Sequence, residues 1–212
     1  MIIVRLPAKG EAILEQPCST SVPVPLLVIV TGPPGTGKTL LSKRLADELH
    51  LLVLNRDTLK ELLFDALGWS DRAWSKQLGI ASYRLLYYML ATLLRARCSC
   101  VVESNFDHHY DTPRLLELQH QFRYRACQIV CHTEPTVLLR RLQQRVGSGE
   151  RHPGHVDHLE LAELDIAEVP GYTAPLEISG LVIDVDTTDF ATIDYAGLVA
   201  QIQNVQTQPE SW

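Results

Sequence analysis

Residues 32–39, Gly-Pro-Pro-Gly-Thr-Gly-Lys-Thr, constrain the fold of this chain more than any other feature. They match the pattern Gly-x-x-x-x-Gly-Lys-Ser/Thr in full, and they follow a short apolar run, residues 26–30, that is typical of a buried parallel strand. Glycines let successive backbone N–H groups turn toward a phosphate, and a helix that begins there adds the positive end of its dipole. The spacing therefore predicts a P-loop between a strand and a helix rather than a simple glycine-rich turn.

The loop also assigns roles to individual side chains. Lys38 is expected to reach the β- and γ-phosphates of ATP, and the Thr39 hydroxyl is expected to bind Mg²⁺. The same loop serves kinases, motor ATPases and GTPases, and this version of it is also typical of ring-forming ATPases, so it leaves the reaction open. The expected nucleotide contacts are Gly32, Pro33, Pro34, Gly35, Thr36, Gly37, Lys38, Thr39 and Leu40.

Strand-like and helix-like segments alternate along the rest of the chain. Strands are expected at residues 26–30, 51–54, 99–103, 126–131 and 181–185, and helices at 37–50, 57–67, 70–97, 113–122, 135–146 and 192–205. This alternation predicts an α/β fold with a doubly wound parallel five-stranded sheet, which binds ligands at the carboxyl ends of its strands. In the long helix Ser70 is the expected cap. The expected buried stripe of that helix is Trp74, Leu78, Ala81, Leu85 and Met89.

Length and composition fit one globular domain. The 212 residues are 46% hydrophobic and 21% charged, and we divide them into a lead-in (1–25) and a P-loop domain (26–212) with a mobile lid at about 134–165. The net charge of −6 disfavours a broadly basic nucleic-acid surface, although a local basic groove stays open. Five cysteines without a secretory segment indicate a cytoplasmic protein, and no apolar run reaches the ~20 residues of a membrane helix.

The segment at the end of the second expected strand, residues 55–60 (Asn-Arg-Asp-Thr-Leu-Lys), carries a candidate general base. A kinase needs a carboxylate near the γ-phosphate to accept the proton of the attacking hydroxyl, and Asp57 is placed for that role. The alternative is that Asp57 only caps the helix that follows. Position alone does not separate the two interpretations.

A second carboxylate, Glu103, closes the third expected strand and is followed by Ser104 and Asn105. P-loop proteins hold the Mg²⁺ shell at this place, one crossover after the phosphate loop. Ring-forming ATPases need an Asp-Glu pair there to activate water, and the serine after Glu103 disfavours that class. The alternative is a strand-end acid that faces solvent.

Basic and histidine side chains cluster later in the chain. Arg141 and Arg145 are four residues apart, so one helical face presents both guanidinium groups, which can clamp a transferring phosphate. The alternative is a solvated basic helix surface, but the Gly-Ser-Gly hinge at residues 147–149 favours a mobile lid. Beyond Arg151, the triplet His152, His155 and His158 permits either a metal site or contacts from a lid or to a substrate.

These motifs together resemble those of a group of small P-loop kinases that includes polynucleotide 5′-hydroxyl kinases, chloramphenicol phosphotransferase, zeta toxins and gluconate kinase. The resemblance covers residues 26–185. Residues 55–60 resemble a motif in which Asp is the base and a following Arg touches the substrate phosphate, but Lys60 replaces that Arg and weakens bidentate recognition. Residues 103–105 resemble the group's Asp-x-Thr-Asn segment with Glu in place of Asp, and Arg141 and Arg145 match its two lid arginines.

The sequence thus predicts an ATP- and Mg²⁺-dependent phosphotransferase that acts on a hydroxyl of a small molecule and has no membrane partner. A polynucleotide 5′-hydroxyl kinase remains one alternative, and an ATP-binding regulatory module that hydrolyses slowly and transfers nothing remains another. By role, the expected residues are Asp57, Lys38, Arg141 and Arg145 for catalysis, Arg56, Lys60 and Asn105 for the acceptor, and Thr39 and Glu103 for the metal.

Overall fold

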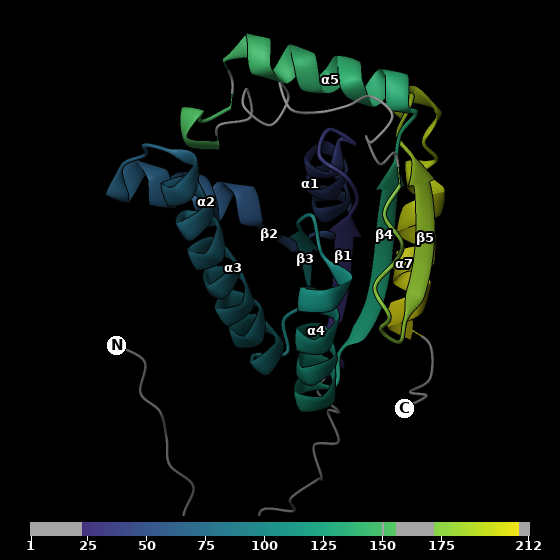
Figure 1. Cartoon of the computed structure of the whole chain (residues 1–212). Coiled ribbons are helices and arrows are strands. Elements are labelled where there is room, and N and C mark those ends of the chain that lie inside the picture. Colours follow the sequence, from purple (N-terminus) through teal and green to yellow (C-terminus); the bar gives the residue numbers. More distant parts are fainter. Residues whose placement is uncertain (1–22, 150, 156–171, 208–212) are drawn as a thin grey trace, which may run out of the picture.

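The computed structural model describes residues 23–149, 151–155 and 172–207 (Figure 1). Most of the expected lead-in therefore lies outside the described residues, as does His158. The strands are β1 (Leu26–Thr31), β2 (Leu52–Asn55), β3 (Cys100–Glu103), β4 (Arg125–His132) and β5 (Leu181–Asp186). The helices are α1 (Lys38–Leu49), α2 (Arg56–Leu67), α3 (Arg72–Arg95), α4 (His108–Phe122), α5 (Pro135–Ser148) and α7 (Tyr195–Thr207), with short 3-10 helices η1 (Pro153–His155) and η3 (Phe190–Thr192).

The five strands form one parallel sheet in the order β2-β3-β1-β4-β5, which confirms the predicted fold class. The central strand, β1, is buried along its whole length. Its register pairs Val30 with Glu103 of β3 and with Ile129 of β4. Because β2 and β3 also pair Asn55 with Glu103, the ends of β1, β3 and β2 lie side by side. That edge of the sheet carries the phosphate loop and both candidate carboxylates.

Helices cover both faces of the sheet, so alternate strand residues enter two different cores. On one face, β1 residues such as Val28 pack with α1 and α7. On the other, β1 residues such as Ile29 pack with α3 and α4. The sheet is therefore the middle of three layers, and its carboxyl edge is the place left for a ligand.

Helix α5 lies across the carboxyl ends of the strands, above the phosphate loop (Figure 1). Its Leu138 and Leu142 are buried, and a Cβ added at Gly35 would lie 2.9 Å from Leu138 Cδ1 and 3.1 Å from Leu142 Cδ2. This helix therefore packs directly on the loop. The mobility expected of the segment stays a prediction.

The buried face of α3 differs from the predicted stripe. Leu85 and Met89 are 41% and 37% exposed, although Leu78 is buried as expected. Two buried serines obscure the true stripe in the sequence, and the hydrogen bond of each hydroxyl is satisfied: Ser75 accepts from Lys60 Nζ of α2 at 3.0 Å, and Ser82 donates to the Gly79 carbonyl of its own helix at 2.7 Å. The buried positions are Ser75, Leu78, Ser82, Leu86, Leu90 and Leu94.

Three helix starts also differ from the sequence prediction. Asp71, rather than Ser70, caps α3, since its Oδ1 accepts from the Trp74 N–H at 2.8 Å. Helix α4 begins at His108, five residues before the expected Pro113, because Asp107 caps it. Helix α7 begins at Tyr195 instead of residue 192, because the preceding residues form η3. A capping aspartate thus fixes the starts of α3 and α4, and the 3-10 turn η3 places the start of α7 later in the chain.

Candidate active site

At two positions of the phosphate loop, glycine combines a positive φ with a neighbour so close that a side chain would overlap it. Gly32 has a φ of 142°, and a Cβ there would overlap the carbonyl oxygen of Cys131. Gly37 has a φ of 79°, and a Cβ there would overlap the ring of Phe190. Helix α1 begins immediately after it, and the Gly37 carbonyl accepts from the Leu40 and Leu41 amides, so the amides of Lys38 and Thr39 precede the first helical hydrogen bond. The loop and those amides form an anion-binding geometry that fits the phosphates of ATP.

Buried polar contacts hold the loop in place. The Thr36 hydroxyl donates to the Pro33 carbonyl at 2.9 Å, and the Thr187 hydroxyl lies 2.7 Å from the Thr36 carbonyl. The Lys38 ammonium donates to the same Pro33 carbonyl at 2.7 Å. Lys38 thus lies inside the loop that it is expected to serve.

The charge of Lys38 depends on its burial and on its neighbours. Burial lowers its pKa to about 8, against the attraction of Glu103 and Asp57, while Arg145 lowers it further. The ammonium is still mostly protonated at pH 7. A phosphate entering the loop would supply the negative charge that this buried cation lacks.

Thr39 and Glu103 form an oxygen pair beside the loop. The Thr39 hydroxyl donates to Glu103 Oε2 at 3.1 Å, and the Asn55 amide also donates to that oxygen. Glu103 is buried, which raises the pKa of its carboxyl, while Lys38 opposes that rise. A hydroxyl and a carboxylate are hard ligands that Mg²⁺ prefers, so these residues fit the ion that ATP brings with it.

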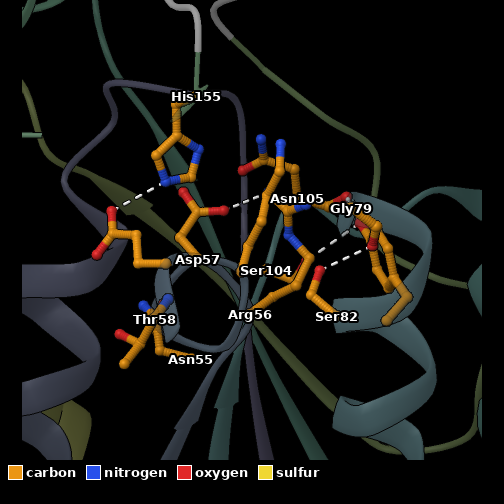
Figure 2. A network of polar contacts seen from close by, with 12 residues as sticks. Asn55, Arg56, Asp57, Thr58, Gly79, Ser82, Ser104, Asn105 and His155 are labelled. Atoms are coloured by element: carbon orange, nitrogen blue, oxygen red, sulfur yellow. Dashed lines mark hydrogen bonds and ion pairs between the residues drawn. The ribbon is translucent and has the colours of Figure 1, made fainter. Parts of the chain in front are cut away.

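Asp57 lies in the first turn of α2 but is not its cap. Asn55 is the cap residue, because its side-chain oxygen accepts from the Thr58 N–H at 2.8 Å. The interpretation of Asp57 as the helix cap is therefore wrong. Its carboxylate is free of that role and points away from the strands, toward His155 (Figure 2).

Two arginines contact the Asp57 carboxylate. Arg56 pairs with Oδ1, and Arg151 Nη2 lies 3.0 Å from Oδ2. Burial alone would raise the pKa of Asp57, but Arg56, Arg151, His155 and Lys38 together hold it at about 2. Asp57 is therefore ionised at neutral pH.

The other side of Arg56 is built from α3 and the end of β3 (Figure 2). Its guanidinium lies 5.1 Å from the ring centroid of Tyr83. The Tyr83 hydroxyl donates to the Asn105 carbonyl at 3.0 Å and accepts from the Ser104 hydroxyl at 3.2 Å. Lys60 differs from the other predicted acceptor residues, because it is buried against Ser75 between α2 and α3.

The two arginines of α5 have different surroundings. Arg141 donates to the carbonyls of Thr187 at 2.8 Å and Thr188 at 3.0 Å, and its guanidinium lies 4.9 Å from the Phe190 ring centroid. Arg145 lies close enough to Lys38 to lower that residue's pKa. The structure thus brings Arg145 to the phosphate loop, and it places Arg141 against the loop that follows β5.

Three residues of this site were not among the predicted catalytic, acceptor and metal residues, although His155 was a candidate for a metal site or for lid or substrate contacts. Glu61 and His155 hydrogen-bond to each other at 2.9 Å, and Arg151 reaches both His155 and Asp57. The sequence carries two signals for them, the histidine triplet that follows Arg151 and the row of acids at positions 57, 61 and 65, which a helix places on one face. Among the described residues no group of three or more His, Cys, Asp or Glu could hold a metal ion.

This fold and loop define a P-loop protein with a kinase-like arrangement of strands and helices. A family model described as an AAA domain matches residues 27–164, so the chain belongs to that family. Its third strand ends in Glu103-Ser104, without the acidic pair expected of ring-forming ATPases. No helix in the described part of the chain is long and apolar enough to cross a membrane.

Solved structures with this fold include kinases. A candidate kinase from Chloroflexus aurantiacus J-10-fl is 40% identical, with 85% of this chain and 98% of that one covered and a TM-score of 0.81. The APS kinase of Mycobacterium tuberculosis, solved with AMPPNP and APS, is 17% identical, with 88% and 99% covered and a TM-score of 0.53. The second likeness shows the fold alone. A search of the curated proteins found no significant match.

The surroundings of Gly37 in the phosphate loop and of Gly147 in α5 predict opposite changes of stability when each glycine is replaced by alanine. Gly37→Ala would place a Cβ in a left-handed position against Phe190, so we expect the free energy of unfolding to fall by about 2 kcal/mol or more. Gly147→Ala adds a Cβ to α5 where no other atom lies within 4 Å, so we expect a gain of about 0.5–1 kcal/mol. Urea unfolding measures both, and equal effects of the same sign would contradict this loop conformation.

Proposed function

We propose that this protein is an ATP- and Mg²⁺-dependent phosphotransferase that moves the γ-phosphate of ATP to a hydroxyl of a small-molecule acceptor. The observation that carries the proposal is the position of Asp57, an ionised carboxylate at the end of β2, on the same sheet edge as the phosphate loop. A P-loop that only bound ATP would not need a carboxylate there, and labelled transfer separates a hydroxyl acceptor from water. The likeness to a candidate kinase over nearly the whole of that protein supports the same class.

In this proposal the loop and its neighbours neutralise the phosphates. When bound, Mg²⁺ would be held by the Thr39 hydroxyl and, through water, by Glu103. It would offset part of the negative charge on the phosphates. Lys38 and Arg145 would face the transferring group, where developing charge is greatest. Arg141 would have to leave the Thr187 and Thr188 carbonyls to join them, so Arg145 is the better-supported of the two.

Asp57 would orient the acceptor hydroxyl and take its proton. Its low pKa makes it a weak base, which suits a reaction whose loose transition state needs little proton removal before the phosphorus–oxygen bond breaks. The Arg56 guanidinium and the surface around Tyr83 and Asn105 would contact the rest of the acceptor.

A polynucleotide substrate has less support. In the related kinase motif the position of Lys60 carries an arginine that touches the substrate phosphate, but here Lys60 is buried and bonds to Ser75. The net charge of −6 also opposes binding of a polyanion.

Labelled ATP tests the proposal directly. The protein is incubated with γ-labelled ATP and Mg²⁺, and separately with pooled small hydroxyl compounds and with 5′-hydroxyl oligonucleotides. We expect label on a small compound and none on the oligonucleotides, because Lys60 is buried against Ser75 and the net charge of −6 opposes a polyanion. Label on oligonucleotide 5′ ends that falls steeply with salt would instead identify a polynucleotide kinase. Release of labelled phosphate alone would indicate an ATP-hydrolysing regulatory module.

A further inference from the structure

We propose that His155, whose ring is oriented by Glu61, is a positioning residue that holds the Arg151 guanidinium against the carboxylate of Asp57. This inference rests on the proposed function, in which Asp57 receives the acceptor hydroxyl. It adds to that function a relay of four side chains, Asp57 and Glu61 of α2 with Arg151 and His155 of the segment 151–155, which fixes where the carboxylate lies.

The four side chains form an unbroken series of contacts that begins and ends on α2. Arg151 Nη2 lies 3.0 Å from Asp57 Oδ2 and 3.0 Å from His155 Nδ1. His155 Nε2 lies 2.9 Å from Glu61 Oε1. Asp57 and Glu61 are one helical turn apart on α2, so both ends of the relay are fixed to the same rigid element.

The chemistry of the donors fixes the tautomer of His155. Arginine has only donors, so Nδ1 of the imidazole must accept from Arg151, and Nε2–H must donate to Glu61. Burial and the nearby Arg151 lower the pKa of His155 to about 3, against the attraction of Asp57, while Lys60 and Arg56 lower it further. The imidazole is therefore neutral at pH 7 and can serve as acceptor and donor at once.

Packing holds the relay segment against α2. The His155 side chain is only 3% exposed, and a Cβ at Gly154 would lie 2.8 Å from ring atoms of Phe64. The same Phe64 ring stacks on His152 with centroids 4.9 Å apart, and His152 Nε2 lies 3.3 Å from Asp65 Oδ1. Each acid in the row along α2 thus meets a partner from residues 151–155.

This arrangement explains why a loop arginine can have a fixed place. A long side chain from a loop loses rotamer entropy when it is held in one conformation, and further contacts must offset that loss. The acceptor nitrogen of His155 supplies a second anchor beyond Asp57, and Glu61 fixes the ring that carries it. Without that anchor the carboxylate would keep Arg56 but lose the steady contact with Arg151.

Two substitutions of His155 separate the contacts of the relay. His155→Asn can place its amide oxygen where Nδ1 accepts from Arg151, whereas His155→Gln can place its amide nitrogen where Nε2 donates to Glu61. Arg151→Gln removes the guanidinium itself. His120→Gln, an exposed position on α4, is the matched control.

The readout is the ionisation of Asp57, followed by carboxyl carbon NMR in the full chain and assigned from its absence in Asp57→Asn. Losing one adjacent cation is expected to raise the Asp57 pKa by about 1 unit in Arg151→Gln, with a shift of the same sign in His155→Gln. His155→Asn and His120→Gln should leave it at the wild-type value. A purely structural role for His155 would not separate the Asn and Gln variants.

The two proposals fail in different ways. Equal titration of Asp57 in His155→Asn and His155→Gln, in variants whose amide spectra show the native fold, would overturn the positioning role. This measurement needs neither ATP nor an acceptor. Failure of the wild-type protein to label any hydroxyl compound would overturn the proposed function instead, and it would leave the titration result unchanged.

Discussion

Lys38→Ala is expected to reduce phosphotransfer by at least about 10²–10³-fold while the protein stays folded. The ammonium lies inside the phosphate loop, 2.7 Å from the Pro33 carbonyl, and is almost fully buried. Transferring phosphate oxygens gain charge in the transition state, and an uncharged alanine cannot offset it. ATP binding should weaken as well, because the same cation faces the phosphates in the ground state.

The stability of this variant should change little. Burial already disfavours the charged form of Lys38, so removing the cation also removes a desolvation cost that partly offsets the lost hydrogen bond. Lys43→Ala, at an exposed position on the same helix, is the matched control and should behave as wild type. Calorimetric ATP binding and labelled transfer measure the effect. Normal turnover in folded Lys38→Ala would mean that the phosphate loop is not the active site.

The sequence predicted those parts of the structure that depend on local pattern. A few neighbouring residues are enough to recognise the phosphate loop at residues 32–39 and each short apolar run. The sequence therefore sufficed to predict the parallel sheet and to place Glu103 at the end of a strand. The buried face of α3 was not, because Ser75 and Ser82 occupy it and hide the apolar period. Buried polar residues whose hydrogen bonds are satisfied interrupt the apolar pattern in the sequence without weakening the packing of the helix.

The cap of α2 was readable but was missed. Asn55 is among the preferred cap residues, and it stands three positions before Thr58, whose N–H it accepts. The relay at Asp57 could not be read in the same way. Arg151 and His155 meet their α2 partners across 94 residues of sequence, and only the folded chain brings them together. The fold of the whole chain brings such residues together, so the spacing of residues within a short stretch of sequence does not reveal these contacts.

Asp57→Asn is the second substitution with a large expected effect. If the carboxylate orients the acceptor hydroxyl and takes its proton, its loss should reduce transfer by roughly 10²–10⁴-fold and leave ATP affinity nearly unchanged. The helix itself should keep its start, because Asn55 provides the cap. Asparagine also keeps an oxygen that can accept from Arg151, so the site should retain its shape.

Some stability should be lost at neutral pH. Arg56 and Arg151 hold the folded pKa of Asp57 at about 2, below its ordinary value, so the ionised carboxylate stabilises the fold at pH above about 4. With a third of the side chain exposed, we expect the loss to be about 1–2 kcal/mol after allowing for solvent screening. The difference from wild type should vanish as pH falls through about 2, where both side chains are neutral.

Three measurements on Asp57→Asn, with exposed Asp47→Asn as the matched control, decide the role of the carboxylate. Urea unfolding gives the stability, calorimetry gives ATP affinity, and single-turnover labelling gives the transfer step. A stable variant that binds ATP but does not transfer would place the chemistry at Asp57. Near-normal transfer would show that Asp57 only pairs with its arginines. Glu103 would then be the next candidate base, because it is the other carboxylate at this edge of the sheet and already contacts Thr39.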